Sequence, residues 1–172
     1  MNIGIIVEGP SDKDVVEVLL SKRGVRAIIR LMRGNNPAKA RGHVNTLLER
    51  GFKKVIVLKD LHGLPARVEK MKEELRSRIS TGGVKIIVVK QSIEAWLLGD
   101  PKAVKRVLGH AVHVANPEEV PKPDEELDKA AMRCGKRYIK GLTTRRLAEE
   151  MDVDRAAEKC PSLKEFLEEL KN

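Results

Sequence analysis

Residues 3–12 read IGIIVEGPSD, an apolar run that ends at a glutamate, a glycine and a proline. A continuous apolar run of this kind is typical of a strand that is covered on both faces of a parallel sheet. The Gly-Pro pair breaks the run, and Ser11 is expected to cap a helix that extends from Asp12 to about Arg23. The chain therefore begins with a strand that leads directly into a helix.

Three further strand patterns alternate with helical patterns along the first half of the chain. Strands at this spacing predict right-handed crossovers and a parallel sheet, so the expected fold class is α/β. The expected strands cover residues 25–32, 54–58 and 85–89, and the expected helices between them cover residues 37–50 and 66–79.

After residue 91 the strand patterns stop. We expect an α/β core in residues 1–91 and a helical extension in residues 92–172, packed on the core as a single compact unit. Helices are expected at residues 93–98, from Asp100-Pro101 onward, and at 124–134, 144–151 and 162–170, with a proline-rich connection at 116–123.

Length and hydropathy restrict the class of protein. The chain has 172 residues, of which 41% are apolar, which suits one core of ordinary size. No apolar stretch approaches the roughly 18 to 20 residues that a membrane span needs. The N-terminus has no basic region before its apolar run and so does not resemble a signal peptide. A soluble, cytoplasmic protein is therefore expected.

Rare residue types exclude further classes. The four aromatic residues are too few for modules that stack nucleic-acid bases on a sheet face. Cys134 and Cys160 form no CxxC pair, which excludes a zinc ribbon and a disulfide scaffold, and both thiols are expected to be reduced and buried. A single glutamine among many lysines and glutamates resembles the composition of proteins from hot environments.

Positive charge is concentrated in the first half of the chain. The formal net charge is +9, and eleven basic residues stand against the single acid Glu49 between Lys22 and Lys59. Such an excess indicates a polyanionic partner, because each neutralised phosphate releases counterions. The alternative is a solvated basic face without a partner. The residues expected to hold a nucleic-acid backbone are Arg26, Arg30, Arg33, Lys39 and Arg41.

Carboxylates follow three of the expected strands. Glu8 and Asp12 follow the first strand, Asp60 follows the third, and Glu94 follows the fourth. Ligands of open parallel sheets bind beyond the carboxyl ends of the strands, so these acids are expected to lie together. Their oxygens are ligands that Mg²⁺ prefers. Each acid alone also fits a helix cap or a satisfied loop residue, so the prediction depends on the set.

Phosphate-binding loops of the common kinds are absent from the sequence. Neither GxGxxG nor GxxxxGK[ST] follows the first strand, and an anionic Glu8 would repel a phosphate there. A carboxylate at this position favours a bound cation over a bound phosphate.

Several segments resemble a known family. Residues 5–9 (IIVEG) with Asp12, and residues 55–60 (VIVLKD), resemble the Toprim domain of primases, topoisomerases and OLD-type nucleases. Over nearly the whole chain the sequence is similar to a small stand-alone Toprim-like family, described as a domain of unknown function and often found beside AAA-type ATPases. The resemblance implies a Toprim/Rossmann-like central parallel sheet flanked by helices, with a C-terminal helical extension. The second-half segments that carry it are SIEAWLL at 92–98, Asp100-Pro101, Asn116-Pro117-Glu118 and KRYIK at 136–140.

The resemblance also implies roles for individual residues. Glu8 would be a metal ligand or general acid/base, Asp60 the first residue of a catalytic Asp-x-Asp pair, and Asp12 a further metal ligand. The sequence departs from the pattern at the third position, where His62 replaces the second aspartate. Imidazole suits Mn²⁺ or Zn²⁺ better than Mg²⁺. The implied cofactor is Mg²⁺ or Mn²⁺, with His62 in the ligand set.

In the helical half, Glu94 and a cluster of basic residues can each be interpreted in two ways. Glu94 either completes a second metal site or is a first-turn carboxylate favoured by the helix dipole. A basic cluster either clamps phosphate and stabilises transition-state charge, or forms a solvated face. The members of that cluster are Lys136, Arg137 and Lys140.

The predicted function is divalent-metal-dependent hydrolysis of phosphodiester bonds in nucleic acid. The alternative is a non-catalytic subunit that binds nucleic acid or serves as an adaptor with an ATPase partner, consistent with His62 in place of a carboxylate. A polymerising or topoisomerase activity fits less well, because the single tyrosine, Tyr138, stands in the helical half.

Overall fold

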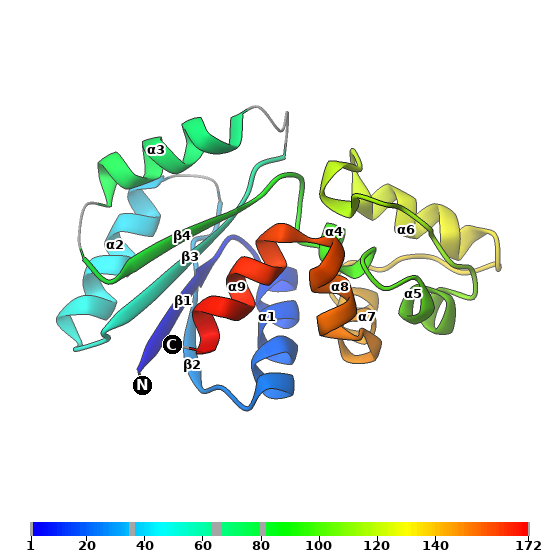
Figure 1. The fold of residues 1–172 in the computed structure, drawn as a ribbon, viewed down its shortest axis with the longest axis horizontal. Coiled ribbons are helices and arrows are strands. Elements are labelled where there is room, and N and C mark those ends of the chain that lie inside the picture. The colour runs from blue at the N-terminus through cyan, green and yellow to red at the C-terminus, as the bar shows by residue number, and fades with distance from the viewer. Residues whose placement is uncertain (1, 35–36, 63–66, 80–81, 172) are drawn as a thin grey trace.

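The central sheet of this computed structural model has four parallel strands in the order β2-β1-β3-β4, within the described residues 2–34, 37–62, 67–79 and 82–171 (Figure 1). Ile5 of β1 lies opposite Ile29 of β2 on one side and opposite Ile56 of β3 on the other. The expected α/β fold class is confirmed. The strands are β1 (Ile3–Val7), β2 (Ala27–Leu31), β3 (Lys54–Asp60) and β4 (Val84–Val89).

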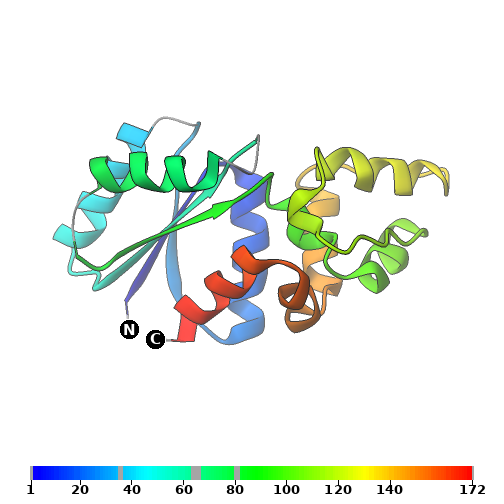
Figure 2. The ribbon, with the colours of Figure 1, turned by 45° about the horizontal axis from the view of Figure 1, so that its top comes forward.

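Helices cover both faces of the sheet (Figures 1 and 2). Successive strand residues point to opposite faces. Ile5 and Ile56 therefore enter the cluster that contains α1 (Pro10–Arg23) and α9 (Pro161–Lys171). Ile6 enters the opposite cluster, with side chains of α2 and α3. The bounds of these two helices are Pro37–Glu49 and Val68–Arg78.

The remaining helices gather beyond the carboxyl ends of the strands (Figures 1 and 2). Trp96 of this group is fully buried, stacks at a tilt on Phe166 with the ring centroids 5.7 Å apart, and donates a hydrogen bond to Ser162 Oγ over 2.8 Å. These helices are α4 (Glu94–Leu97), α5 (Pro101–Leu108), α6 (Pro123–Met132), α7 (Leu142–Glu150) and α8 (Val153–Lys159), with a 3-10 turn η2 at Pro117–Glu119.

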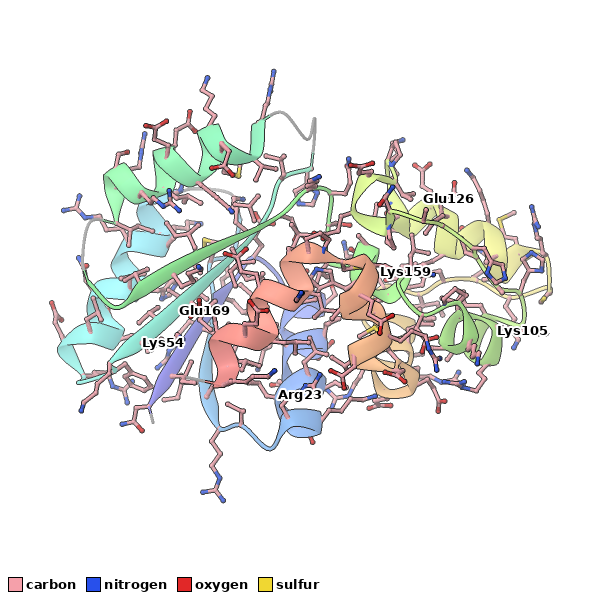
Figure 3. The ribbon with its side chains drawn as sticks, viewed as in Figure 1. Arg23, Lys54, Lys105, Glu126, Lys159 and Glu169 are labelled. Carbon is pink, nitrogen blue, oxygen red and sulfur yellow. The ribbon has the colours of Figure 1, made fainter. Side chains whose placement is uncertain are left out.

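Ion pairs fasten α9 back onto the first half of the chain. Lys54 Nζ lies 2.5 Å from Glu169 Oε2, and the two residues lie close together in Figure 3. Lys85 of β4 pairs with Glu165 over 3.1 Å. A single hydrophobic cluster contains residues of β1 and of α9, so the two halves share one core.

The start of α1 differs from the prediction. The helix begins at Pro10, and the backbone N–H of Gly9 donates to Asp12 Oδ2 over 2.9 Å, so the expected cap at Ser11 is wrong. Proline is favoured at the first helical position, where its missing N–H is not needed. Asp12 is consequently drawn back toward the end of β1.

Three other predictions need correction. Strand β3 continues to Asp60, two residues beyond the expected end. Helix α8 is absent from the expected set, since about two turns between two capping residues give little periodicity. Cys160 is buried as expected, but Cys134 is exposed. The start of the helix expected at 66–79 lies partly outside the described residues.

Within the described residues, we find no helix with the length and apolar character required to cross a membrane.

Candidate metal centre

The strand order reverses between β1 and β3, and a pocket of about 460 Å³ opens at their carboxyl ends. Such a reversal leaves a crevice in which ligands of open α/β sheets bind. The pocket walls come from the β1–α1 turn, the ends of β2 and β3, and the turn before α7. The lining residues are Glu8, Gly9, Pro10, Ser11, Asp12, Gly34, Asp60, His62, Lys140 and Gly141.

Glu8 lies at the end of β1 with its carboxylate inside the protein. Lys59 Nζ donates a hydrogen bond to Glu8 Oε1, and His62 Nε2 lies 3.3 Å from Glu8 Oε2. Burial alone would raise the pKa of Glu8, but the contacts with His62 and Lys59 outweigh it and leave that pKa below its usual value. Glu8 is therefore held in its ionised form.

Asp60 is the last residue of β3 and is buried. Its backbone N–H donates to Glu8 Oε2 over 3.3 Å, and its Oδ2 accepts from the backbone N–H of Ile93 over 3.3 Å. Burial, followed by repulsion from Asp12 and Glu8, raises the pKa of Asp60 well above its ordinary value. A positive charge in the pocket would relieve this repulsion.

Asp12 approaches the same pocket from the first turn of α1. Burial raises its pKa to about 6, with further contributions from the charges of Glu94 and Glu8 and an opposing one from the Gly9 hydrogen bond. The pKa values of Asp12 and Asp60 are thus both raised, first by burial and then by the neighbouring carboxylates, as expected of acids that are buried together without enough positive charge.

His62 completes a set of candidate metal ligands. One atom each from Glu8, Asp60 and His62 lies within 4.8 Å of the others, and these three residues could hold a metal ion. The backbone of His62 adopts a φ of 49°, and its N–H donates to the carbonyl of Gln91 over 2.9 Å. Half of the imidazole remains exposed, so the ligand set opens toward the pocket.

Glu94 lies beside these residues at the start of α4. Its side chain is only 1% exposed, and Lys140 Nζ lies 3.2 Å from its Oε1. Lys140 belongs to the turn before α7, far from Glu94 in the sequence. The attraction of Glu94 outweighs the effect of burial and raises the pKa of Lys140.

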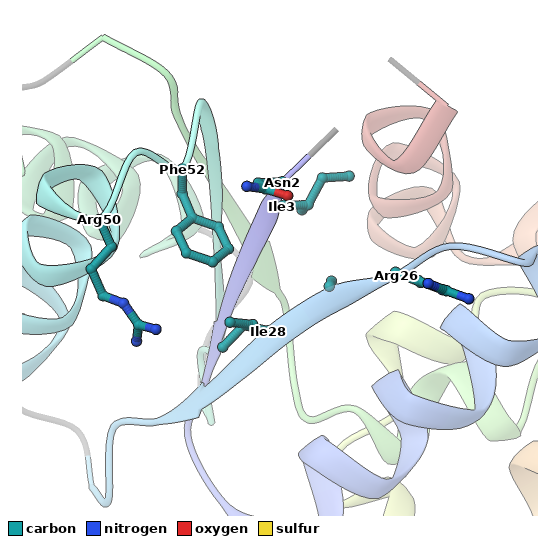
Figure 4. Close-up of a pocket in the computed structure, with 7 residues that line it drawn as sticks. Asn2, Ile3, Arg26, Ile28, Arg50 and Phe52 are labelled. Atoms are coloured by element: carbon teal, nitrogen blue, oxygen red, sulfur yellow. The ribbon is translucent and has the colours of Figure 1, made fainter.

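The basic residues expected to bind nucleic acid do not form one surface. Arg33 lies beside the pocket, since its backbone N–H donates to the Glu8 carbonyl over 3.2 Å, and Lys39 Nζ donates to the Arg33 carbonyl over 2.9 Å. Arg41 is exposed on α2, and Arg30 is exposed on β2. Arg26 lines a different pocket, at the amino ends of the strands, together with Arg50 and Phe52 (Figure 4).

The three residues of the basic cluster in the helical half also have different surroundings. Arg137 makes two 2.9 Å hydrogen bonds to the carboxylate of Asp128, and Lys136 Nζ reaches the carbonyl of Val107 over 3.4 Å. Of these three cluster residues, Lys140 is the one that lines the carboxylate pocket.

Lys59 is a site residue that sequence reasoning missed. Ending the third strand at Leu58 leaves Lys59 in a loop, where lysine is common. The structure keeps it in β3, with its side chain only 4% exposed and its ammonium on Glu8. A charged residue directly before Asp60 in a strand with apolar residues on both faces is the signal that could have identified it.

Comparison with known proteins adds one result. A family model described as a domain of unknown function (DUF4276) matches residues 7–171. No curated protein and no solved structure matches the chain significantly.

Proposed function

We propose a function for this chain, which belongs to the DUF4276 family, from its site: divalent-metal-dependent hydrolysis of phosphodiester bonds in nucleic acid. The observation that carries the proposal is the convergence of Glu8, Asp60 and His62, with ligand atoms within 4.8 Å, on a pocket that Lys140 also lines. The resemblance of residues 5–12 and 55–60 to Toprim nucleases favours the same chemistry.

The residues present fit a divalent cation. Glu8 is held ionised, whereas the raised pKa values of Asp12 and Asp60 mark carboxylates that lack positive charge. Two carboxylates and an imidazole suit Mn²⁺ at least as well as Mg²⁺. Glu8, Asp60 and His62 would hold the ion, and Asp12 would lie beside them.

Each group in the pocket then has a defined part in hydrolysis. The ion, when bound, would supply a Lewis acid that activates water and offsets charge on the scissile phosphate. Lys59 keeps Glu8 ionised and oriented, which suits a ligand better than a proton donor. Lys140 lines the pocket and the backbone of Arg33 bonds to Glu8 beside it, so these two residues would hold the phosphodiester backbone.

Cleavage assays with the full chain test this proposal. Labelled single- and double-stranded DNA and RNA are incubated with Mg²⁺, Mn²⁺ or EDTA, with the wild type, Glu8→Ala and Asp60→Asn. We expect cleavage that requires metal and is lost in both variants. Asp14→Asn is the matched control, because Asp14 lies on α1 near Asp12 but outside the pocket lining, and it should cleave like the wild type. Cleavage that survives Asp60→Asn would remove that residue from the mechanism.

One observation favours a second candidate function. Glu8 already bonds to the Lys59 ammonium and faces His62, so its charge is partly satisfied without metal. A non-catalytic subunit that binds nucleic acid, with an AAA-type ATPase as partner, would keep the basic residues and need no ion. Salt-dependent binding that EDTA leaves unchanged, with no cleavage in any metal, would favour this candidate.

A further inference from the structure

A second pair of acids, Asp12 and Glu94, lies outside the set of Glu8, Asp60 and His62. Asp12 lines the pocket, and Glu94 is buried close enough for its charge to act on Asp12, so the pair forms an acidic corner at the edge of the pocket. Glu94 Oε1 is buried and has no hydrogen bond within the described residues, although the Lys140 ammonium pairs with it at 3.2 Å. The cation that this buried oxygen faces is therefore an ammonium group.

Hydrogen bonds on both sides of Lys140 hold the turn that places it at this corner. On one side, the Tyr138 hydroxyl bonds to Thr144 Oγ1 over 2.5 Å. On the other side, the Gly141 N–H donates to the same Thr144 Oγ1 over 3.1 Å, with Gly141 at a φ of 92° that favours glycine. The lysine is therefore delivered to the pocket by a turn fixed at both ends.

The formal charges in and beside the pocket balance for one divalent ion. With His62 neutral as a metal ligand, four carboxylates and two ammonium groups leave an excess of two negative charges. One divalent cation neutralises this excess, whereas two would leave an excess of two positive charges, which burial disfavours. Without the Lys140 ammonium, one ion would leave a negative charge unmatched, and two ions would leave an excess of only one positive charge. The carboxylates are those of Glu8, Asp12, Asp60 and Glu94, and the ammonium groups are those of Lys59 and Lys140.

We infer that the Lys140 ammonium takes the place of a second metal ion at the corner of Glu94 and Asp12, so that the protein binds one divalent ion per chain. This inference rests on the metal site of the proposed function. Lys140 is thus a fixed positive charge on the side of the pocket where Glu94 would otherwise recruit a second cation.

Mn²⁺ binding tests the inference without a cleavage assay. The metal-free full chain is titrated with Mn²⁺ at neutral pH, and bound ions per chain are counted from the spin-resonance signal of the free ion and by calorimetry. We expect one ion for the wild type and two for Lys140→Met. Lys140→Arg keeps the charge and should bind one. Lys105→Met, at an exposed position on α5, is the matched control and should also bind one.

The possible results separate the inference from the proposed function. Two ions in the wild type, or one ion in Lys140→Met, would overturn the role of Lys140 while leaving the metal site intact. Adding Glu94→Gln to Lys140→Met should return the count to one, and a count that stays at two would also overturn the assignment. No bound ion in the wild type would instead overturn the metal site itself.

Discussion

Lys59 of β3 donates a hydrogen bond to Glu8 at the end of the neighbouring strand β1, and both side chains are buried. A buried ion pair is costly to break from one side, because the remaining charge is left without a partner. The pair therefore ties the stability of the sheet to the chemistry of the pocket.

Removal of the ammonium should destabilise the protein strongly. For Lys59→Met we expect a loss of about 3 to 5 kcal/mol in the free energy of unfolding at neutral pH. Urea denaturation measures it, and Lys53→Met, at an exposed position just before β3, is the control with little expected change. Adding Glu8→Gln should recover much of the loss. Equal stability of Lys59→Met and the control would contradict the pairing.

The raised pKa of Asp12 gives the metal-free protein a pH dependence with a definite sign. Its carboxyl titrates at 3.8 when unfolded and at about 6 when folded, so the folded state holds the proton longer. The free energy of unfolding should therefore fall as the pH rises from about 4 to about 6, by up to roughly 3 kcal/mol. Asp12→Asn should remove the contribution of Asp12 and leave the fall that the raised pKa of Asp60 causes. Denaturation curves at several pH values in EDTA check it, and parallel curves for both proteins would disprove it.

Asp100 should contribute more to stability than the exposed Asp152, whose backbone N–H donates a hydrogen bond to it. It is fully buried and accepts from the N–H groups of Lys102 over 3.1 Å and Asp152 over 2.8 Å, and its Oδ1 pairs with Arg155 at 3.3 Å. Asp100→Ala should cost about 3 kcal/mol in unfolding free energy, because three part-buried donors lose their common acceptor. Asp152→Ala removes the α8 cap on the Arg155 N–H and an exposed ion pair with the Arg155 guanidinium at 3.6 Å, and should cost about 1 kcal/mol. Similar costs in thermal or urea unfolding would contradict this ranking.

Two arginines that look alike in the sequence should differ in nucleic-acid binding. Arg33 lies beside the carboxylate pocket, whereas Arg26 lines the pocket at the opposite ends of the strands. Arg33→Ala should weaken binding and lower the salt-dependence slope by about 1, as expected for one lost phosphate contact. Arg26→Ala should leave both unchanged. Fluorescence anisotropy over a range of salt concentrations measures the difference, and the reverse order would place the binding surface elsewhere.

Much of the fold was predictable because its elements depend on local patterns. The apolar runs of β1, β3 and β4 are buried on both faces, and alternation with helices is enough to indicate a parallel sheet. The cap of α1 was not predictable in detail, since Ser11 and Gly9 both suit a helix start. Only the position of Asp12, folded back onto the Gly9 N–H, decides between them.

The candidate site was predictable in its carboxylates and not in its cations. Strand ends of a parallel sheet meet at one edge, which brings Glu8 and Asp60 together. The pairing of Lys140 with Glu94 joins residues 46 positions apart through the packing of α7, which no local pattern encodes. The burial of Lys59 could not be predicted for the same reason, because it depends on a partner from another strand, Glu8.

The left-handed backbone at position 62 restricts which residues can take the place of His62 in the pocket. Histidine, asparagine and aspartate are the side-chain-bearing residues that adopt a positive φ most readily, so each fits the turn that His62 occupies at 49°. An aspartate there would present oxygen where the imidazole now presents nitrogen, while the hydrogen bond from the backbone N–H to Gln91 stays in place. Evolution or protein engineering could thus exchange a softer donor for a hard one, and with it the metal that the proposed site would prefer, through a single substitution that keeps the backbone of this turn.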